Sequence, residues 1–140
     1  MGKSAKIEAE SKAAVEHGKA HFHETLGNLP EPIRAMMEYI PDHFVGYLRF
    51  REAVYREPEG KGHLDLKTKE LLYVVLDIVT GNLDGAKNHG AAAFRAGMTS
   101  MELAEACMQI MHVCGVTTWG KTGYKVVDYI AELEREAKKS

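Results

Sequence analysis

Two stretches with helical apolar spacing, joined at a glycine, constrain the fold of this chain more than any other feature. Apolar residues recur through residues 67–80 without strict alternation, and Gly81 follows as a natural helix C-terminus. A second helical stretch begins near Asn82 and ends at Ala96, with Gly97 after it. Because the stretches are separated by so few residues, the pattern predicts two helices that fold back on each other as an antiparallel hairpin.

The rest of the chain also has helical spacing, and no segment has the alternation of a strand. Further helices are expected at about residues 6–25, 33–39, 41–54, 100–114 and 124–138. Asp65 is a plausible N-cap, Thr99 to Glu102 form a capping-box sequence, and Gly115 to Gly120 are expected to be a hinge. The predicted fold is all-α, a compact helical bundle. Its 140 residues suit one domain, with residues 1–62 as a helical N-terminal arm that carries no chemical motif.

Composition excludes several classes of partner. The 18 basic and 20 acidic residues give a net charge of −2, so no basic surface is expected to bind nucleic acid or an anionic membrane. The longest apolar stretch, Leu71 to Val79, contains Asp77 and is too short to cross a bilayer, and the first dozen residues are polar. We therefore expect a cytoplasmic protein.

The cysteines do not predict a redox or metal site. Cys107 and Cys114 are seven residues apart in one helical stretch, about 10 Å along its axis, too far for a disulfide between them. They are expected to act as small hydrophobic residues. No Cys/His cluster has structural-zinc spacing, so neither a metal nor a cofactor is expected.

A polar stripe runs along the apolar helix before Gly81. Glu70, Tyr73, Asp77 and Thr80 follow one another at spacings of three, four and three, which places them on one face. The helix is otherwise apolar nearly all round and is expected to be buried. The stripe either faces solvent or forms the wall of a cavity, and in a cavity its carboxylates would need partners.

The second helix of the hairpin can supply such a partner. Glu70 lies eleven residues before Gly81, about 16 Å, and His89 lies eight residues after it, about 12 Å. The difference is about one helical turn, so the two side chains can meet across the hairpin. The same helix carries Gly90 among several alanines, which either let another helix approach closely or leave room for a ligand.

These segments together resemble the carboxymuconolactone decarboxylase family. The resemblance rests on Leu64 to Leu72, on Asn82 to His89, on the small residues before Gly97 and on Cys114-Gly-Val116. It covers about residues 64–130 and implies an alkylhydroperoxidase D-like helical bundle with the family core at 63–138. It also implies His89 and Glu70 as catalytic residues and a homo-oligomer, a trimer or hexamer.

Two branches of that family differ in chemistry. The alkylhydroperoxidase D branch is a thiol peroxidase whose motif is Glu, then Cys-x-x-Cys-x-x-x-His. Aligned on His89 and Gly97, the two thiol positions fall on Asn82 and Gly85, so the peroxide-reducing thiols are absent. The decarboxylase branch has no motif cysteines and acts without a cofactor on a carboxylated lactone from the breakdown of aromatic compounds. An Asn-His pair common in that branch is replaced by Gly120-Lys121.

The retained groups suit acid–base chemistry on a small substrate. His89 would transfer the proton, Glu70 would orient it, and Lys121 would pair with a substrate carboxylate or stabilise an enolate. The other expected substrate-binding residues are Trp119, His112, Tyr73, Asp77 and Asn82. The leading hypothesis is a cofactor-free lyase or isomerase. The alternatives are an alkylhydroperoxidase D-like antioxidant with peroxiredoxin activity and a non-catalytic binding or assembly subunit.

Overall fold

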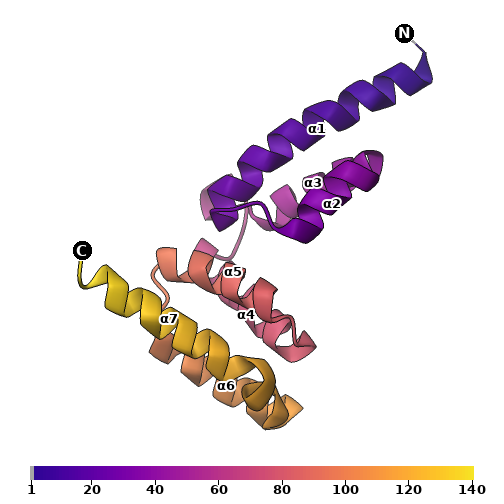
Figure 1. The fold of residues 1–140 in the computed structure, drawn as a ribbon. Coiled ribbons are helices and arrows are strands. Elements are labelled where there is room, and N and C mark those ends of the chain that lie inside the picture. The colour runs from indigo at the N-terminus through magenta and orange to yellow at the C-terminus, as the bar shows by residue number, and fades with distance from the viewer. Residues whose placement is uncertain (1) are drawn as a thin grey trace. The chain divides into compact units, whose positions relative to one another are not determined.

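The structure, a computed structural model, describes residues 2–140. Within that range it has seven α-helices and no strand, so the predicted all-α fold class is confirmed (Figure 1). The chain divides into two compact units, Met1–Gly62 and His63–Ser140. This division falls where the sequence predicts the end of an N-terminal arm, and the single-domain organisation stays a prediction.

The first unit consists of α1 (Lys3–Leu26), α2 (Glu31–Tyr39) and α3 (Pro41–Val54), followed by the 3₁₀ turn η1 (Pro58–Gly60). Prolines in the first turns of α2 and α3 start both helices, and Gly27 ends α1 in the left-handed conformation, with φ of 79°. Helix α1 packs along α3 (Figure 1), because Gly18 leaves room for the Phe44 ring. A Cβ at Gly18 would lie 2.5 Å from that ring.

The second unit begins with the predicted hairpin. Helix α4 (Leu66–Thr80) turns back into α5 (Leu83–Arg95) at Gly81, whose φ is 75° (Figure 1). The Asp65 side chain accepts a hydrogen bond from the Thr68 amide as the expected N-cap. Helices α6 (Ser100–Cys114) and α7 (Tyr124–Ala137) complete the unit, and the capping box of Thr99 and Glu102 is present at the start of α6.

The core of the second unit contains buried side chains from α4, α5, α6 and α7, and α5 packs closely on α7 within it. Gly90 allows this close approach, since a Cβ there would lie 3.2 Å from Ile130 Cδ1 and 3.5 Å from Val126 Cγ1. The sequence left two roles open for the small residues of this helix, close packing of a second helix or space for a ligand. At Gly90 the structure shows close packing.

Two expectations about this unit are wrong. Helix α4 is not buried all round, because Leu72, Leu76 and Val79 form an exposed apolar face. The polar stripe contains fully buried Glu70, so polarity alone did not indicate which face is covered. The expected hinge at Gly115 to Gly120 is also shorter, because Trp119–Gly123 form a π-helical turn, η2, that continues into α7.

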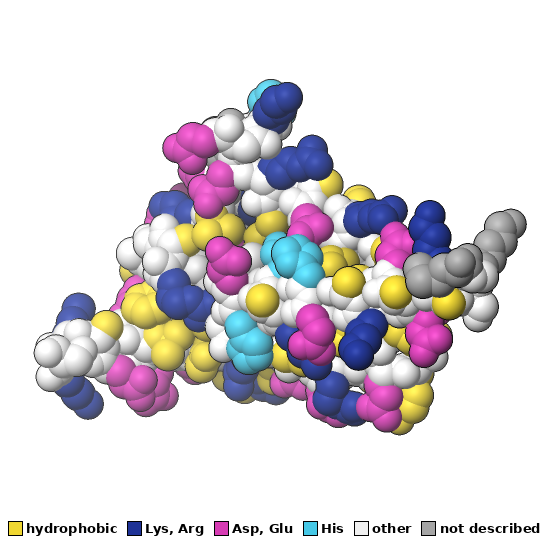
Figure 2. Space-filling view, turned by 90° about the horizontal axis from the view of Figure 1, so that it is seen from above, with side chains coloured by type: hydrophobic (Ala, Val, Ile, Leu, Met, Phe, Trp, Pro, Cys, Tyr) yellow, Lys and Arg dark blue, Asp and Glu magenta, His cyan; other side chains and the backbone are white. Residues whose placement is uncertain are grey.

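The surface has mixed charge. On the face seen in Figure 2, acidic and basic side chains are interspersed over the helices, and no large patch has a single sign. None of the helices described in residues 2–140 has the length and apolar character needed to cross a membrane.

Candidate functional site

The predicted contact between Glu70 and His89 is present in the helix hairpin. His89 Nδ1 lies 2.7 Å from Glu70 Oε2, so the hydrogen bond joins α5 to α4. The Glu70 side chain is fully buried, and that of His89 is 16% exposed. An ionised carboxylate can only accept a hydrogen bond, so beside an ionised Glu70 the proton of a neutral imidazole lies on Nδ1, and Nε2 keeps its free lone pair.

An aromatic ring fixes the orientation of this imidazole. The Tyr73 ring stacks on the His89 ring with centroids 4.4 Å apart and planes 15° from parallel. Tyr73 lies one helical turn after Glu70 on α4, so the same face of the helix supplies both contacts. The imidazole is therefore constrained at one nitrogen and on one face.

Asp77 lies one turn further along α4 and is the second carboxylate near the imidazole. Its Oδ1 accepts a 2.9 Å hydrogen bond from Asn82 Nδ2, whereas its Oδ2 is buried without a hydrogen-bond partner. Burial raises the pKa of Asp77, although the electrostatic interaction with His89 and the hydrogen bond from Asn82 both act to lower it. Glu70 also has one buried oxygen without a partner, Oε1.

Asn82 has a structural role at the turn of the hairpin. Its Oδ1 accepts a hydrogen bond from the Gly85 amide as the N-cap of α5, while its amide nitrogen bonds to Asp77. A Cβ at Gly85 would lie 2.2 Å from Asn82 Nδ2 and 2.8 Å from Asp77 Oδ2, so only glycine fits beneath this network.

Among the described residues, the other three predicted residues make no hydrogen bond, ion pair or ring contact with these side chains. Lys121 and His112 are exposed, and their side chains make no hydrogen bond or ion pair among the described residues. Trp119 is half-buried in η2 against the core of the second unit, and its ring contact is with Tyr124 at 6.4 Å. Five of the eight predicted residues thus lie in two linked groups: Glu70, Tyr73 and His89 are joined by contacts, Asp77 and Asn82 by a hydrogen bond, and His89 acts electrostatically on Asp77.

The cysteines lie outside this network. Cys107 is buried, and burial raises the pKa of its thiol to about 11, which makes it a poor nucleophile at neutral pH. Cys114 is an exposed free thiol. Across residues 2–140, no group of three or more His, Cys, Asp or Glu side chains is placed to hold a metal ion.

Comparison with known proteins decides the family. The sequence model of the carboxymuconolactone decarboxylase family matches residues 41–122, which include Glu70 and His89. The chain belongs to the carboxymuconolactone decarboxylase family. The family match runs from the start of α3 to η2, so it begins earlier than the resemblance seen at about residues 64–130.

A solved structure extends this likeness to nearly the whole chain. The crystal structure of the "putative carboxymuconolactone decarboxylase" of Burkholderia xenovorans is 36% identical, with a TM-score of 0.86. The alignment covers 93% of this chain and 98% of that one, so the likeness extends well beyond the residues that the family model matches. No curated protein is similar enough to this chain to count as a match.

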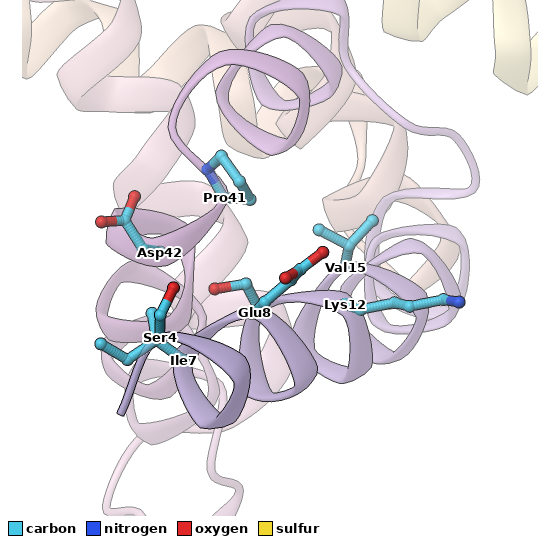
Figure 3. A pocket seen from close by; sticks show the side chains of 8 residues that line it. Ser4, Ile7, Glu8, Lys12, Val15, Pro41 and Asp42 are labelled. Carbon is cyan, nitrogen blue, oxygen red and sulfur yellow. The ribbon is translucent and has the colours of Figure 1, made fainter. Parts of the chain in front are cut away.

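A groove in the first unit is separate from the family chemistry. It has a volume of about 690 Å³ and lies between the N-terminal half of α1 and the start of α3 (Figure 3). Its walls carry Ile7, Val15 and Pro41 together with charged Glu8 and Lys12. No imidazole lines it, so it is not where the predicted proton transfer would occur.

Proposed function

We propose that this protein is a cofactor-free enzyme that removes CO₂ from, or moves a proton on, a small carboxylated lactone or keto compound. The observation that carries the proposal is the buried hydrogen bond between Glu70 and His89, which leaves a partly exposed imidazole with one nitrogen available. An imidazole suits this role because its ordinary pKa is close to neutral pH.

In the isomerisation form of the reaction, His89 Nε2 takes a proton from the carbon next to the substrate carbonyl. The electrons of the broken C–H bond move into the carbonyl to form an enolate. His89 then returns the proton to another carbon of the conjugated system. Glu70 accepts the Nδ1 hydrogen bond throughout and stabilises the imidazolium that forms.

In the decarboxylation form, the bond between the substrate carbon and its carboxylate breaks. CO₂ leaves, and the electron pair enters the conjugated lactone or ketone as an enolate. Protonated His89 then donates a proton to that carbon. Lys121 would stabilise the enolate or orient the substrate carboxylate by its charge. In both forms Trp119, His112, Tyr73, Asp77 and Asn82 stay predicted substrate-site residues, and the cytoplasmic location also stays a prediction.

The decisive experiment measures turnover of a panel of small lactones and keto acids by wild type and two variants. His89→Asn keeps most of the volume of the side chain but cannot act as a base, so we expect a loss of roughly 100-fold or more in kcat. Glu70→Gln should lose less, because the base remains and only its orientation and charge are affected. His63→Asn is the matched control and should be unchanged, because this exposed side chain has no hydrogen bond within residues 2–140.

The same panel distinguishes the alternatives. A non-catalytic subunit would bind a ligand without converting any member of the panel, and His89→Asn would then change only binding. An alkylhydroperoxidase D-like antioxidant would reduce an organic peroxide with a dithiol donor and lose that activity in the double variant Cys107→Ser, Cys114→Ser. We expect negligible peroxide reduction by wild type, because Asn82 and Gly85 occupy the positions of the motif thiols.

A further inference from the structure

The first unit contains a buried arginine that is held firmly in place. Arg51 of α3 is only 5% exposed. Its guanidinium carbon lies 4.0 Å from the centroid of the Phe22 ring and 4.1 Å from that of the Tyr55 ring, so two aromatic side chains contact it. Its Nη1 donates a 2.9 Å hydrogen bond to Thr25 Oγ1. These contacts leave the guanidinium little freedom to turn toward solvent.

Among the described residues, this arginine has no direct ion-pair partner. In that part of the chain, its Nη2 is also buried without a hydrogen-bond partner. By contrast, exposed Arg49 on the same helix pairs with Glu10 at 2.6 Å. Aromatic faces offset part of the charge. A buried cation with an unused donor nevertheless strongly favours an anion beside it.

A second buried polar atom without a hydrogen-bond partner belongs to a side chain that contacts the same Tyr55 ring. His21 Nε2 is buried without a hydrogen-bond partner, and the His21 ring meets the Tyr55 ring edge-on at 5.9 Å. Burial lowers the pKa of His21, and the positive charge of Arg51 lowers it further. The imidazole is therefore neutral at neutral pH and can present an N–H at Nε2.

We propose that Arg51 and His21 form a binding site for the carboxylate group of a small molecule. Arg51 Nη2 and His21 Nε2 are two unused donors beside one aromatic ring, and a carboxylate has two acceptor oxygens to match them. A phosphate group would bring additional oxygens that these two donors cannot satisfy. The site lies within the first unit and does not depend on the chemistry proposed for Glu70 and His89.

The ligand would reach Arg51 past His21. Both donor atoms are covered in the structure, but the His21 residue as a whole is half-buried, whereas Arg51 is sealed by two rings. Rotation of the His21 side chain is therefore the smaller movement that opens the site. Once bound, the carboxylate would lie beside the imidazole.

That position makes binding dependent on pH. An anion beside His21 favours the charged imidazolium, so binding should raise the pKa of His21 and tighten as the pH falls through it. The charged groups that already act on His21 are Arg51 and Glu52 of α3 and His17 and Glu24 of α1. Arg51 and His17 lower the pKa of His21, whereas Glu52 and Glu24 raise it.

The test uses the full chain in sodium acetate, sodium phosphate and sodium chloride at equal ionic strength. Two quantities are measured: the thermal unfolding midpoint, and the pKa of His21 from its imidazole NMR signal, assigned with a His21→Phe variant. Acetate should raise both quantities in wild type relative to chloride. Arg51→Gln should weaken acetate binding by about tenfold or more, because a charge-assisted hydrogen bond is lost. Arg49→Gln, with the same change of charge at an exposed position, should bind acetate as wild type does.

Each outcome decides the proposal. If acetate and chloride have the same effect on wild type in both measurements, there is no carboxylate site. If acetate has the same effect on Arg51→Gln as on wild type, the response is a general salt effect and the proposal is overturned. The proposal is also overturned if Arg49→Gln loses the response as fully as Arg51→Gln does. A larger response to phosphate than to acetate would show that the ligand class is wrong. If Arg51→Gln does not fold, the shift of the His21 pKa in wild type still decides between presence and absence of the site.

Discussion

At the scale of single residues, the two carboxylates of α4 have different surroundings although they share one helix face. Glu70 is fully buried and accepts a hydrogen bond from His89. Asp77 has Asn82 as its hydrogen-bond donor and keeps a buried oxygen without a partner. The residue that opposes each carboxylate, His89 within α5 or Asn82 at its N-cap, therefore determines the environment of that carboxylate.

The raised pKa of Asp77 leads to a prediction about stability. The pKa of Asp77 in the folded state lies above its ordinary value of 3.8. As the pH rises from 3.8 through the folded-state pKa, the unfolded chain loses this proton more easily than the folded protein, so the free energy of unfolding falls. Asp77→Asn should therefore raise the urea unfolding midpoint above that of wild type at neutral pH. The difference should disappear below the ordinary value, where both side chains are neutral. Asp128→Asn, at an exposed aspartate of α7, is the control, and a less stable Asp77→Asn at pH 7 would contradict the prediction.

At the scale of helices, α5 and α7 depend on the absence of a side chain at Gly90. Gly90→Val should lower the free energy of unfolding by about 1–3 kcal/mol, because its methyl groups would press on Ile130 and Val126. Chemical denaturation measures the loss, and adding Ile130→Ala to the same variant should recover part of it. If the double variant is less stable by the full sum of both single losses, the two positions do not compete for space.

Helices α6 and α7 are joined by a carboxylate at the start of α6. Glu134 of α7 accepts hydrogen bonds from the Ser100 amide at 2.6 Å and from the Ser100 hydroxyl at 2.7 Å. These bonds lower the pKa of Glu134, so its contribution to stability is present above the ordinary glutamate pKa and is lost as the pH falls through the lowered value.

Replacement of this carboxylate tests the link. Glu134→Gln should cost about 1 kcal/mol in the free energy of unfolding at pH 7, because a neutral amide accepts these bonds less strongly. The loss should shrink in acid, where the wild-type carboxyl is also neutral. Exposed Glu132 on the same helix provides the matched variant Glu132→Gln, which should show neither effect. If both variants lose the same free energy of unfolding, the stability depends on the net charge of α7 and not on the hydrogen bonds between Glu134 and Ser100.

At the scale of the whole molecule, the second unit exposes a row of large apolar side chains on one helix, and such rows often mark contact surfaces. Leu72, Leu76 and Val79 form a row on α4, and Met101, Met108, Val113 and Val116 are also exposed. Family membership makes association between copies the natural explanation, so a trimer or a hexamer stays our prediction for the state in solution.

Light scattering at micromolar concentration checks this prediction. Wild type should have a mass of three or six chains, and Leu76→Lys should shift the population toward smaller species, because a buried lysine in an interface is costly. Glu132→Lys introduces the same side chain at a polar exposed position and should leave the mass unchanged. A wild-type monomer at this concentration would contradict the prediction.

The local parts of the fold could be predicted because their causes are local. Asp65, the capping box at Thr99 and the glycine stop at Gly81 depend on residues within one turn of themselves. The contact between Glu70 and His89 followed from counting helical rise from that stop, since a tight turn leaves little freedom in the register of a hairpin.

What tertiary structure alone decided was which faces are covered and which distant side chains meet. Sequence polarity suggested that α4 would hide its apolar residues, yet packing covers Glu70 and exposes Leu76. Arg51 and Thr25 are 26 residues apart on different helices, so no spacing rule could relate them. Burial is a property of the neighbours that a face acquires, and those neighbours come from elsewhere in the chain. The sequence by itself therefore determined the helices, their ends and one hairpin contact, while packing determined the surroundings of each charge.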